Sequence, residues 1–293
     1  MTTQFKATDF TMKKVDTEQE PPSKTQVFDP FAAKIEIAKS KEQAMNEELM
    51  AKDPTKLAKP EELGPIKAWS FSALKSFEEC QYRSYLKGVV KVKEESSIAG
   101  ARGQKIHDLA EHFVRGDIEK MPKELNKFAT KFERLKQRFQ SQSEEFPITL
   151  EENWGFTSQW SPTGWVGKET WCRQKLDAFV TDSTTGATVI DYKTGRKFGN
   201  ELKHGEQGLH YAIGSFMRYP HLDFVRTEFW YLDKGEELVK NYTRERALLH
   251  LPKIHQRGII MTATTEFHPN PSKNNCRWCS YAANKQCDFA HED

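Results

Sequence analysis

Two short extended segments joined by a tight turn constrain the fold of this chain more than any other feature. Residues 171–181 and 188–194 are rich in apolar and β-branched side chains, and residues 182–186 between them are polar and end in glycine. This pattern is typical of the two strands of a β-hairpin. The compact part of the chain is therefore predicted to contain an antiparallel strand pair.

The predicted hairpin carries two acids and a lysine. Side chains two positions apart on a strand share a face, so Asp191 and Lys193 point the same way. Antiparallel pairing brings Asp177 within about one register step of Asp191. Two carboxylates this close repel each other, and a divalent cation removes that cost. Oxygen ligands favour Mg²⁺ or Mn²⁺ over zinc. A surface ion pair between Asp191 and Lys193 is the simpler alternative.

His107 is a candidate third ligand on a neighbouring helix. Residues 103–114 have an apolar stripe at helical spacing that includes Ile106, and we expect His107 on the opposite face with its ring free. Lys193 suits the placing of an attacking water and the offsetting of charge on phosphate oxygens. Glu111, one turn after His107, is either a partner that orients the imidazole or an ordinary surface side chain.

Helices and one further strand are predicted around the hairpin. Helical patterns cover residues 72–86 with Ser72 as N-cap, residues 103–114, a segment that begins at Pro122, and residues 206–218 and 244–261; residues 227–232 form the strand. Helices outside a short central sheet indicate an α/β domain.

Residues 1–65 differ in composition from the rest of the chain. They contain no Trp or Tyr, many Lys and Glu, and several proline breakers, with one possible helix over residues 31–50. We interpret them as a flexible arm, with docking of a protein partner as the functional alternative. No signal-peptide pattern or apolar run of roughly 18 residues is present, so a cytoplasmic protein without a membrane span is expected.

The net charge of +2 requires any nucleic-acid binding to come from local patches. Arg196 and Lys197, just past Lys193, are candidates for contacts near a scissile phosphate. Basic residues also recur at about one helical turn after Pro122, and they form either a solvated helix face or a row of phosphate contacts. These residues are Lys123, Lys127, Lys131, Arg134 and Arg138.

Four cysteines form a one-plus-three pattern. Cys80 stands near the start of the compact region, and Cys276, Cys279 and Cys287 lie near the end. In a reducing compartment such a set favours metal binding over disulfides. A four-coordinate site of this kind would tie the two ends of the domain together. Zinc and iron–sulfur clusters both accept four thiolates, and the spacing does not choose between them.

An ordered set of motifs resembles the RecB-type branch of the PD-(D/E)XK nucleases. The set begins with residues 69–74 and Cys80, and the match extends over roughly residues 66–290. The remaining motifs are Gly103-x-x-x-His107, Asp177, Asp191-Tyr192-Lys193-Thr194-Gly195 and Gln207-x-x-x-Tyr211. Gln81 departs from the family, whose members often have proline after the first cysteine.

The resemblance implies a role for each matched residue. His107, Asp177, Asp191 and the backbone carbonyl of Tyr192 would bind Mg²⁺ or Mn²⁺, and Lys193 would be catalytic together with both acids. Gln207 and Tyr211, which share a helix face at i and i+4, would contact DNA near the scissile phosphate. The CRISPR-associated four-cysteine nucleases and the AddB nuclease domain hold a 4Fe–4S cluster with the same cysteine layout, which shifts the preference from zinc to iron–sulfur.

The implied fold is a PD-(D/E)XK core, a short mixed sheet flanked by helices, with a helical insertion and a C-terminal cysteine region within residues 66–293. The implied function is a metal-dependent deoxyribonuclease, an exonuclease on single-stranded DNA or DNA ends in repair, recombination or replication. Two alternatives stay open. One is a catalytically silent iron–sulfur module that binds DNA within a larger complex, and the other is a zinc-stapled interaction protein.

Overall fold

A computed structural model describes residues 62–95 and 97–291. The strands are β1 (Trp69–Ser70), β2 (Ile148–Phe156), β3 (Pro162–Thr163), β4 (Cys172–Ser183), β5 (Gly186–Lys193), β6 (Phe224–Tyr231) and β7 (Glu236–Thr243). The α-helices are α2 (Phe71–Glu79), α3 (Gln81–Tyr85), α4 (Ile98–Arg115), α5 (Ala129–Gln140), α6 (Glu201–Arg218), α7 (Arg244–Leu248), α8 (Leu251–Ala263), α9 (Lys273–Arg277) and α10 (Ser280–Ala283). A π-helical turn, η2 (Leu86–Val90), follows α3, and a 3₁₀-helix, η3 (Lys123–Phe128), precedes α5.

The strands form one mixed sheet in the order β3-β2-β4-β5-β6-β7, with β1 paired parallel to β4. The predicted hairpin is present as the antiparallel pair β4–β5. After β5 the chain crosses through α6 and returns as β6, which pairs parallel to β5. This crossover brings the start of α6 back over the carboxyl end of β5, where Asp191 and Lys193 lie.

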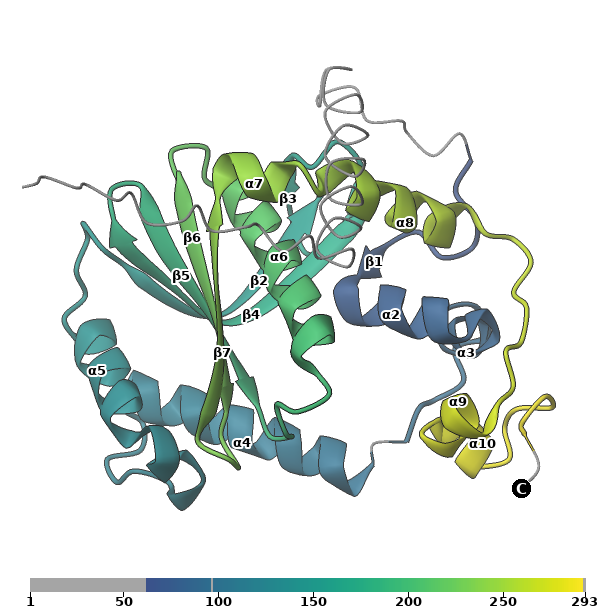
Figure 1. The fold of residues 1–293 in the computed structure, drawn as a ribbon, viewed down its shortest axis with the longest axis horizontal. Helices are drawn as coiled ribbons and strands as arrows, with labels where there is room; N and C mark the ends of the chain where they lie inside the picture. The colour runs from purple at the N-terminus through teal and green to yellow at the C-terminus, as the bar shows by residue number, and fades with distance from the viewer. Residues whose placement is uncertain (1–61, 96, 292–293) are drawn as a thin grey trace, which may run out of the picture. The chain divides into compact units, whose positions relative to one another are not determined.

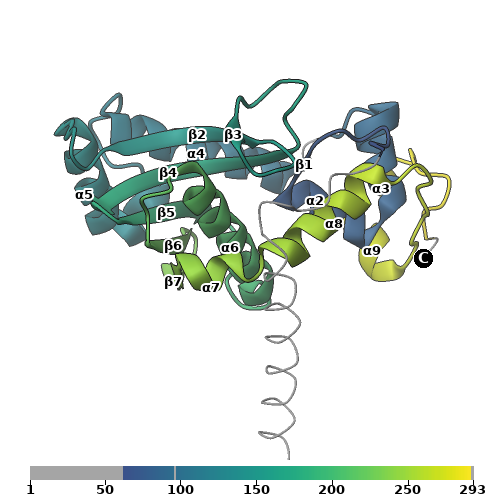
Figure 2. The same ribbon diagram turned by 90° about the horizontal axis from the view of Figure 1, so that it is seen from above.

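Helices cover both faces of the sheet, with α4 and α5 on one face and α6 and α7 on the other (Figures 1 and 2). The core under α4 and α5 contains Ala110, Phe132 and Tyr192, and the core under α6 contains Val189, Ile213 and other residues that also reach α2 and α8. The predicted α/β class with a mixed central sheet flanked by helices is therefore confirmed.

Strands β2 and β7 were not predicted. The segment of β2 contains a run of polar residues, Glu151, Glu152 and Asn153, which hides the alternation of a half-buried strand. The β7 strand lies at the edge of the sheet, and its charged side chains are typical of a protected edge.

Two predicted helices are each divided into two, and one predicted cap is wrong. Ser70 rather than Ser72 caps α2, because its hydroxyl accepts from the N–H of Ala73 at 3.4 Å. The backbone at Cys80 is extended, with φ −160° and ψ 109°, and it separates α2 from α3. The predicted helix 244–261 is similarly divided between α7 and α8.

Helix α4 begins five residues before its predicted start. Ser97 caps it by accepting from the N–H of Gly100 at 3.0 Å. Most of the predicted arm lies outside the described residues, but Gly64 is buried and donates its N–H to the carbonyl of Thr262 at 2.7 Å. The compact region therefore includes Gly64, slightly before the predicted boundary. Within residues 62–95 and 97–291, no helix is long and apolar enough to cross a membrane.

Candidate active site

The candidate site lies where β4 and β5 separate. Their ladder ends at the pair Ala178–Ile190, so Asp177 and Asp191 are the first residues beyond it on the two strands. The N–H of Tyr192 donates to the carboxylate of Asp177, with an N–Oδ2 distance of 2.6 Å. Asp177 is 8% exposed and Asp191 is 5% exposed. The divergence therefore holds two buried acids beside each other, as the hairpin register predicted.

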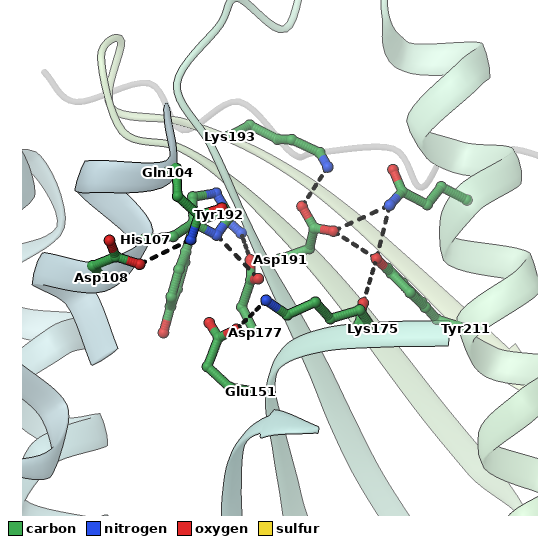
Figure 3. A network of polar contacts seen from close by, with 11 residues as sticks. Gln104, His107, Asp108, Glu151, Lys175, Asp177, Asp191, Tyr192, Lys193 and Tyr211 are labelled. Carbon is green, nitrogen blue, oxygen red and sulfur yellow. Dashed lines mark hydrogen bonds and ion pairs between the residues drawn. The ribbon is translucent and has the colours of Figure 1, made fainter. Parts of the chain in front are cut away.

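His107 reaches Asp177 from α4, and its Nδ1 lies 3.1 Å from Asp177 Oδ1 (Figure 3). Burial disfavours the imidazolium, but the hydrogen bond and charge of Asp177 outweigh it and raise the pKa of His107 above its ordinary value. The ring lies beside Tyr192, so the expectation that it points away from the Ile106 stripe is wrong. Consecutive helical residues are only about 100° apart, so both can face the sheet.

Glu151 joins this group from β2, although the sequence analysis did not single it out. It occupies the β2 position opposite Asp177, between the paired residues Leu150–Ala178 and Glu152–Leu176 of the β2–β4 ladder. One donor atom from each of His107, Glu151 and Asp177 lies within 4.8 Å of the other two. Helix α4 and strands β2 and β4 thus supply a nitrogen and two carboxylates to one small volume.

The backbone at Glu151 has φ 54°, in the left-handed region that non-glycine residues seldom adopt. Such a conformation costs about 1–3 kcal/mol and often marks a functional position. Its carboxylate lies 2.7 Å from the ammonium of Lys175. Burial raises the pKa of Glu151 despite this ion pair. The two consecutive acids, Glu151 and Glu152, were the only sequence signal for this residue.

Asp191 lies between Lys193 and helix α6. Its Oδ2 is 2.6 Å from Lys193 Nζ, which confirms that the two side chains share a face. On the other side, Oδ1 accepts from the Tyr211 hydroxyl at 2.8 Å and from Gln207 Nε2 at 3.2 Å. The i and i+4 spacing therefore places Gln207 and Tyr211 at the same carboxylate oxygen, a contact that the sequence analysis did not foresee.

Tyr211 is 5% exposed, whereas Gln207 is half-buried. Gln207 Nε2 also donates to the Tyr211 hydroxyl at 2.7 Å, so the two side chains brace each other as well as Asp191. Their predicted contact with DNA stays a prediction, and Gln207 is the more accessible of the two. Tyr192 adjoins the site through its N–H, and the ligand role of its carbonyl likewise stays a prediction.

The donor set fits a hard divalent cation. Burial raises the pKa of Asp191; the charge of Lys193 opposes this shift, and the nearby Asp177 reinforces it. The ionised form of Asp191 is therefore only partly compensated within the protein. A dication beside Asp177 and Asp191 would favour that form, and carboxylate oxygens with one imidazole suit Mg²⁺ or Mn²⁺.

Arg196 and Lys197 lie in the loop between β5 and α6, just beyond Lys193. Neither side chain forms a hydrogen bond or ion pair within the part of the chain that the structure describes, so both are available for the predicted contacts. Glu111 pairs with Arg115 at 2.8 Å rather than with His107. Of the two alternatives for Glu111, the structure favours an ordinary surface side chain over a partner that orients His107.

The basic row after Pro122 is largely occupied by contacts within the protein. Lys127 donates to the carbonyl of Asp233, Lys131 pairs with Glu228 and Glu237, and Arg138 pairs with Asp182. These contacts favour a structural helix face over a row of phosphate contacts.

The four predicted cysteines, Cys80, Cys276, Cys279 and Cys287, line one cavity beneath the α2–α3 junction. Burial, together with the neighbouring thiols of Cys279, Cys80 and Cys276, raises the pKa of Cys287. Cys80 lies between two helices rather than within one. All four thiols are free, and Cys172, which was not part of the predicted set, is buried elsewhere in the core.

Protein contacts also hold the C-terminal segment against Cys80. The side chains of Asn270 and Asn275 donate to the carbonyl of Glu79, and the N–H of His268 donates to Gln81 Oε1 at 3.1 Å. Gln81 begins α3 and so stands at a position that proline also tolerates. In this chain it adds a side-chain link to the C-terminal segment.

The sequence of residues 68–284 matches the family model of the PD-(D/E)XK nuclease superfamily. The chain belongs to the PD-(D/E)XK nuclease superfamily. No curated protein matches it significantly. Membership implies a nucleic-acid substrate and a divalent metal for this nuclease domain.

Solved structures resemble the nuclease domain only distantly. The protein SSO0001 aligns at 13% identity with a TM-score of 0.43, covering 87% of this chain and 98% of its own. A protein from Eubacterium rectale, named as a candidate exonuclease, aligns at 12% identity with a TM-score of 0.41, covering 78% of this chain and 91% of its own. At these scores the likeness carries no argument about function.

Proposed function

We propose that this nuclease is a Mg²⁺- or Mn²⁺-dependent deoxyribonuclease of the RecB-like branch that acts on single-stranded DNA or DNA ends. The observation that carries the proposal is the group at the β4–β5 divergence. His107 contacts Asp177 there, Asp191 occupies the facing position on β5, and the Lys193 ammonium lies 2.6 Å from Asp191. The motifs from residues 69 to 211 support the branch, and repair, recombination or replication is the expected setting.

His107, Asp177 and Asp191 would hold the metal, and Glu151 is a further candidate because its carboxylate lies close to His107 and Asp177. The metal would polarise the phosphate and lower the pKa of a coordinated water. Lys193 lies beside this group, where its ammonium can orient the attacking water and offset charge on the phosphate oxygens. Gln207 and Tyr211 hold Asp191 in place from α6.

The decisive experiment is cleavage of 5′- and 3′-labelled single-stranded DNA with increasing Mn²⁺. We expect cleavage by the wild type, with the order of product lengths giving the direction. Lys193→Ala should reduce the rate by at least about 100-fold while the protein stays folded at the assay temperature, since one electrostatic group at a reacting centre contributes at this scale. DNA binding without cleavage by the wild type would favour the silent module instead.

The four cysteines are proposed to hold a 4Fe–4S cluster that fastens the C-terminal segment to the α2–α3 junction. Two observations support the proposal: the four cysteines line one cavity, and their one-plus-three layout is that of the iron–sulfur nucleases that the sequence resembles. Zinc with four thiolate ligands is the alternative.

Iron, sulfide and zinc analysis of anaerobically purified protein tests the cluster. We expect iron and sulfide, with absorbance near roughly 400 nm, and their loss in Cys276→Ala. Cys172→Ala, at a thiol outside the cavity, should keep both. Stoichiometric zinc without sulfide would replace the cluster with a zinc site.

A further inference from the structure

An exposed aromatic side chain stands at the tip of the loop that follows the candidate catalytic strand. Phe198 is 78% exposed, and Leu202, the second residue of α6, is 92% exposed. Both follow Lys193 within nine positions of the chain. Large apolar side chains at this exposure are costly to leave in water when they cluster, and they often mark binding surfaces.

The loop is built to hold Phe198 outward. The N–H of Asn200 donates to the carbonyl of Lys197 at 2.8 Å, which closes a turn with Phe198 and Gly199 at its centre. Gly199 has φ +83°, the value that the third residue of a type II turn requires. Asn200 Nδ2 also donates to the carbonyl of Arg196 at 2.9 Å. The turn thus fixes the backbone on both sides of Phe198 before any partner binds.

Cations flank this apolar tip along the chain. Arg196, Lys197 and Lys203 lie within five positions of Phe198, and none of their side chains forms a hydrogen bond or ion pair with the residues that the structure describes. The nearest acid in sequence, Glu201, accepts from the N–H of Gly199 at 2.8 Å. An aromatic ring with free cations around it suits a nucleic-acid strand, whose bases stack while its phosphates pair with the cations.

The turn that carries Phe198 lies close along the chain to the candidate catalytic residue Lys193. Phe198 is five residues beyond Lys193, and five residues span at most about 18 Å of chain. This reach corresponds to a few nucleotides of an extended strand. A ring at this distance can stack only on a base whose face is free, because the bases inside a duplex already stack on both neighbours.

We propose that Phe198 stacks on an unpaired base of the DNA strand a few nucleotides from the scissile phosphate, and that this contact makes the nuclease prefer single-stranded over fully paired DNA. The inference rests on the proposed nuclease function and names the part of the substrate that the loop recognises. Arg196, Lys197 and Lys203 hold the phosphates on either side of that base.

The test compares Phe198→Ala with Val166→Ala, a control at a side chain that is 77% exposed in the loop between β3 and β4. Binding of a fluorescent single-stranded oligonucleotide is measured by anisotropy in EDTA, and cleavage is measured in Mn²⁺. Phe198→Ala should weaken single-strand binding and raise KM by about 10-fold or more, the scale of one base–aromatic stack. Phe198→Trp should restore both, and Val166→Ala should match the wild type.

A series of oligonucleotides with one abasic position tests stacking directly. Moving the abasic position along the strand should reveal one position where the wild type loses about 10-fold in affinity and Phe198→Ala loses nothing further. Equal losses in both proteins at every position would overturn the proposal, as would equal weakening of single-stranded and duplex binding. Wild-type binding without cleavage would defeat the nuclease function while leaving the stacking result readable.

Discussion

The hydroxyl of Tyr211 donates to Asp191 from an almost fully buried position, so its loss cannot be repaired by water. Hydrogen bonds to a charged group contribute about 1.5–3 kcal/mol. We therefore predict that Tyr211→Phe lowers kcat by about 10- to 100-fold with little change in KM, and that it lowers the melting temperature by several degrees while leaving the protein folded. Tyr242→Phe, which removes a hydroxyl bonded to the carbonyl of Gly205, is the matched control. Equal activity in the two variants would remove Tyr211 from the site.

His210 gives a second prediction at the scale of a residue. It is 1% exposed, and burial lowers its pKa from 6.5 to about 3. Below pH 6.5 the unfolded chain binds a proton at His210 and the folded chain does not. The contribution of neutral His210 to the free energy of unfolding is therefore fully present above pH 6.5. Below it, the free energy of unfolding should fall by about 1.4 kcal/mol per pH unit, or about 2 kcal/mol by pH 5.

Urea unfolding at pH 7, 6 and 5 measures this dependence. His210→Gln should be less stable at pH 7 but should lose less on acidification. His204, whose pKa burial lowers to about 4, should keep part of the slope in this variant. An identical slope in both proteins would mean that His210 is not its source.

Helices α2, α6 and α8 are joined by one guanidinium. Arg257 of α8 pairs with Glu78 of α2 at 2.6 Å and with Glu206 of α6. Its side chain is 18% exposed, so its charge is only partly screened by water. By contrast, Arg102 pairs with Asp233 at 2.7 Å with half of its side chain exposed.

We predict that Arg257→Met lowers the free energy of unfolding by about 1–2 kcal/mol, because Glu78 and Glu206 lose their shared guanidinium and keep the ammonium of Lys75 as a partner. Arg102→Met should cost less than about 1 kcal/mol, as exposed pairs do. Urea unfolding of the two variants compares them. Equal losses would mean that burial does not distinguish these ion pairs.

Much at the scale of elements could be predicted from local pattern. The β4–β5 hairpin has strong apolar runs around a turn, and its register brought Asp177 to Asp191. The ends of the helices were harder to predict from the sequence, because the cap at Ser70 and the break at Cys80 depend on contacts with distant segments. Glu151 could not be predicted, since its place depends on the pairing of β2 with β4 and on an unusual φ that no local pattern records.

For the whole molecule, the site joins parts of the chain that are distant in sequence. Helix α4 and strands β2, β4 and β5 each supply one of its ligand candidates, so a bound metal would link them and favour the folded chain. We predict that Mn²⁺ at about 100 times its Kd stabilises the wild type by about 2.7 kcal/mol. This gain corresponds to a rise of several degrees in melting temperature.

Asp177→Asn should lose most of this rise, as measured by differential scanning calorimetry with and without Mn²⁺. Asp182→Asn, at a half-exposed acid that pairs with Arg138, should keep it. A shift that survives in Asp177→Asn would assign the bound Mn²⁺ to another place. The basic row after Pro122 could not be interpreted from the sequence alone. Only the folded chain shows that Lys131 and Arg138 already pair with acidic side chains, and are therefore not free for phosphate groups.

The cavity that unites Cys80 with Cys276, Cys279 and Cys287 has a consequence for biosynthesis. During translation Cys80 leaves the ribosome long before its three companions are made, so it must wait as an unprotected thiol. Oxidation in that interval would block loading even if the finished polypeptide were otherwise intact. Any inorganic group held by all four thiols can be inserted only after Cys287 has been synthesised.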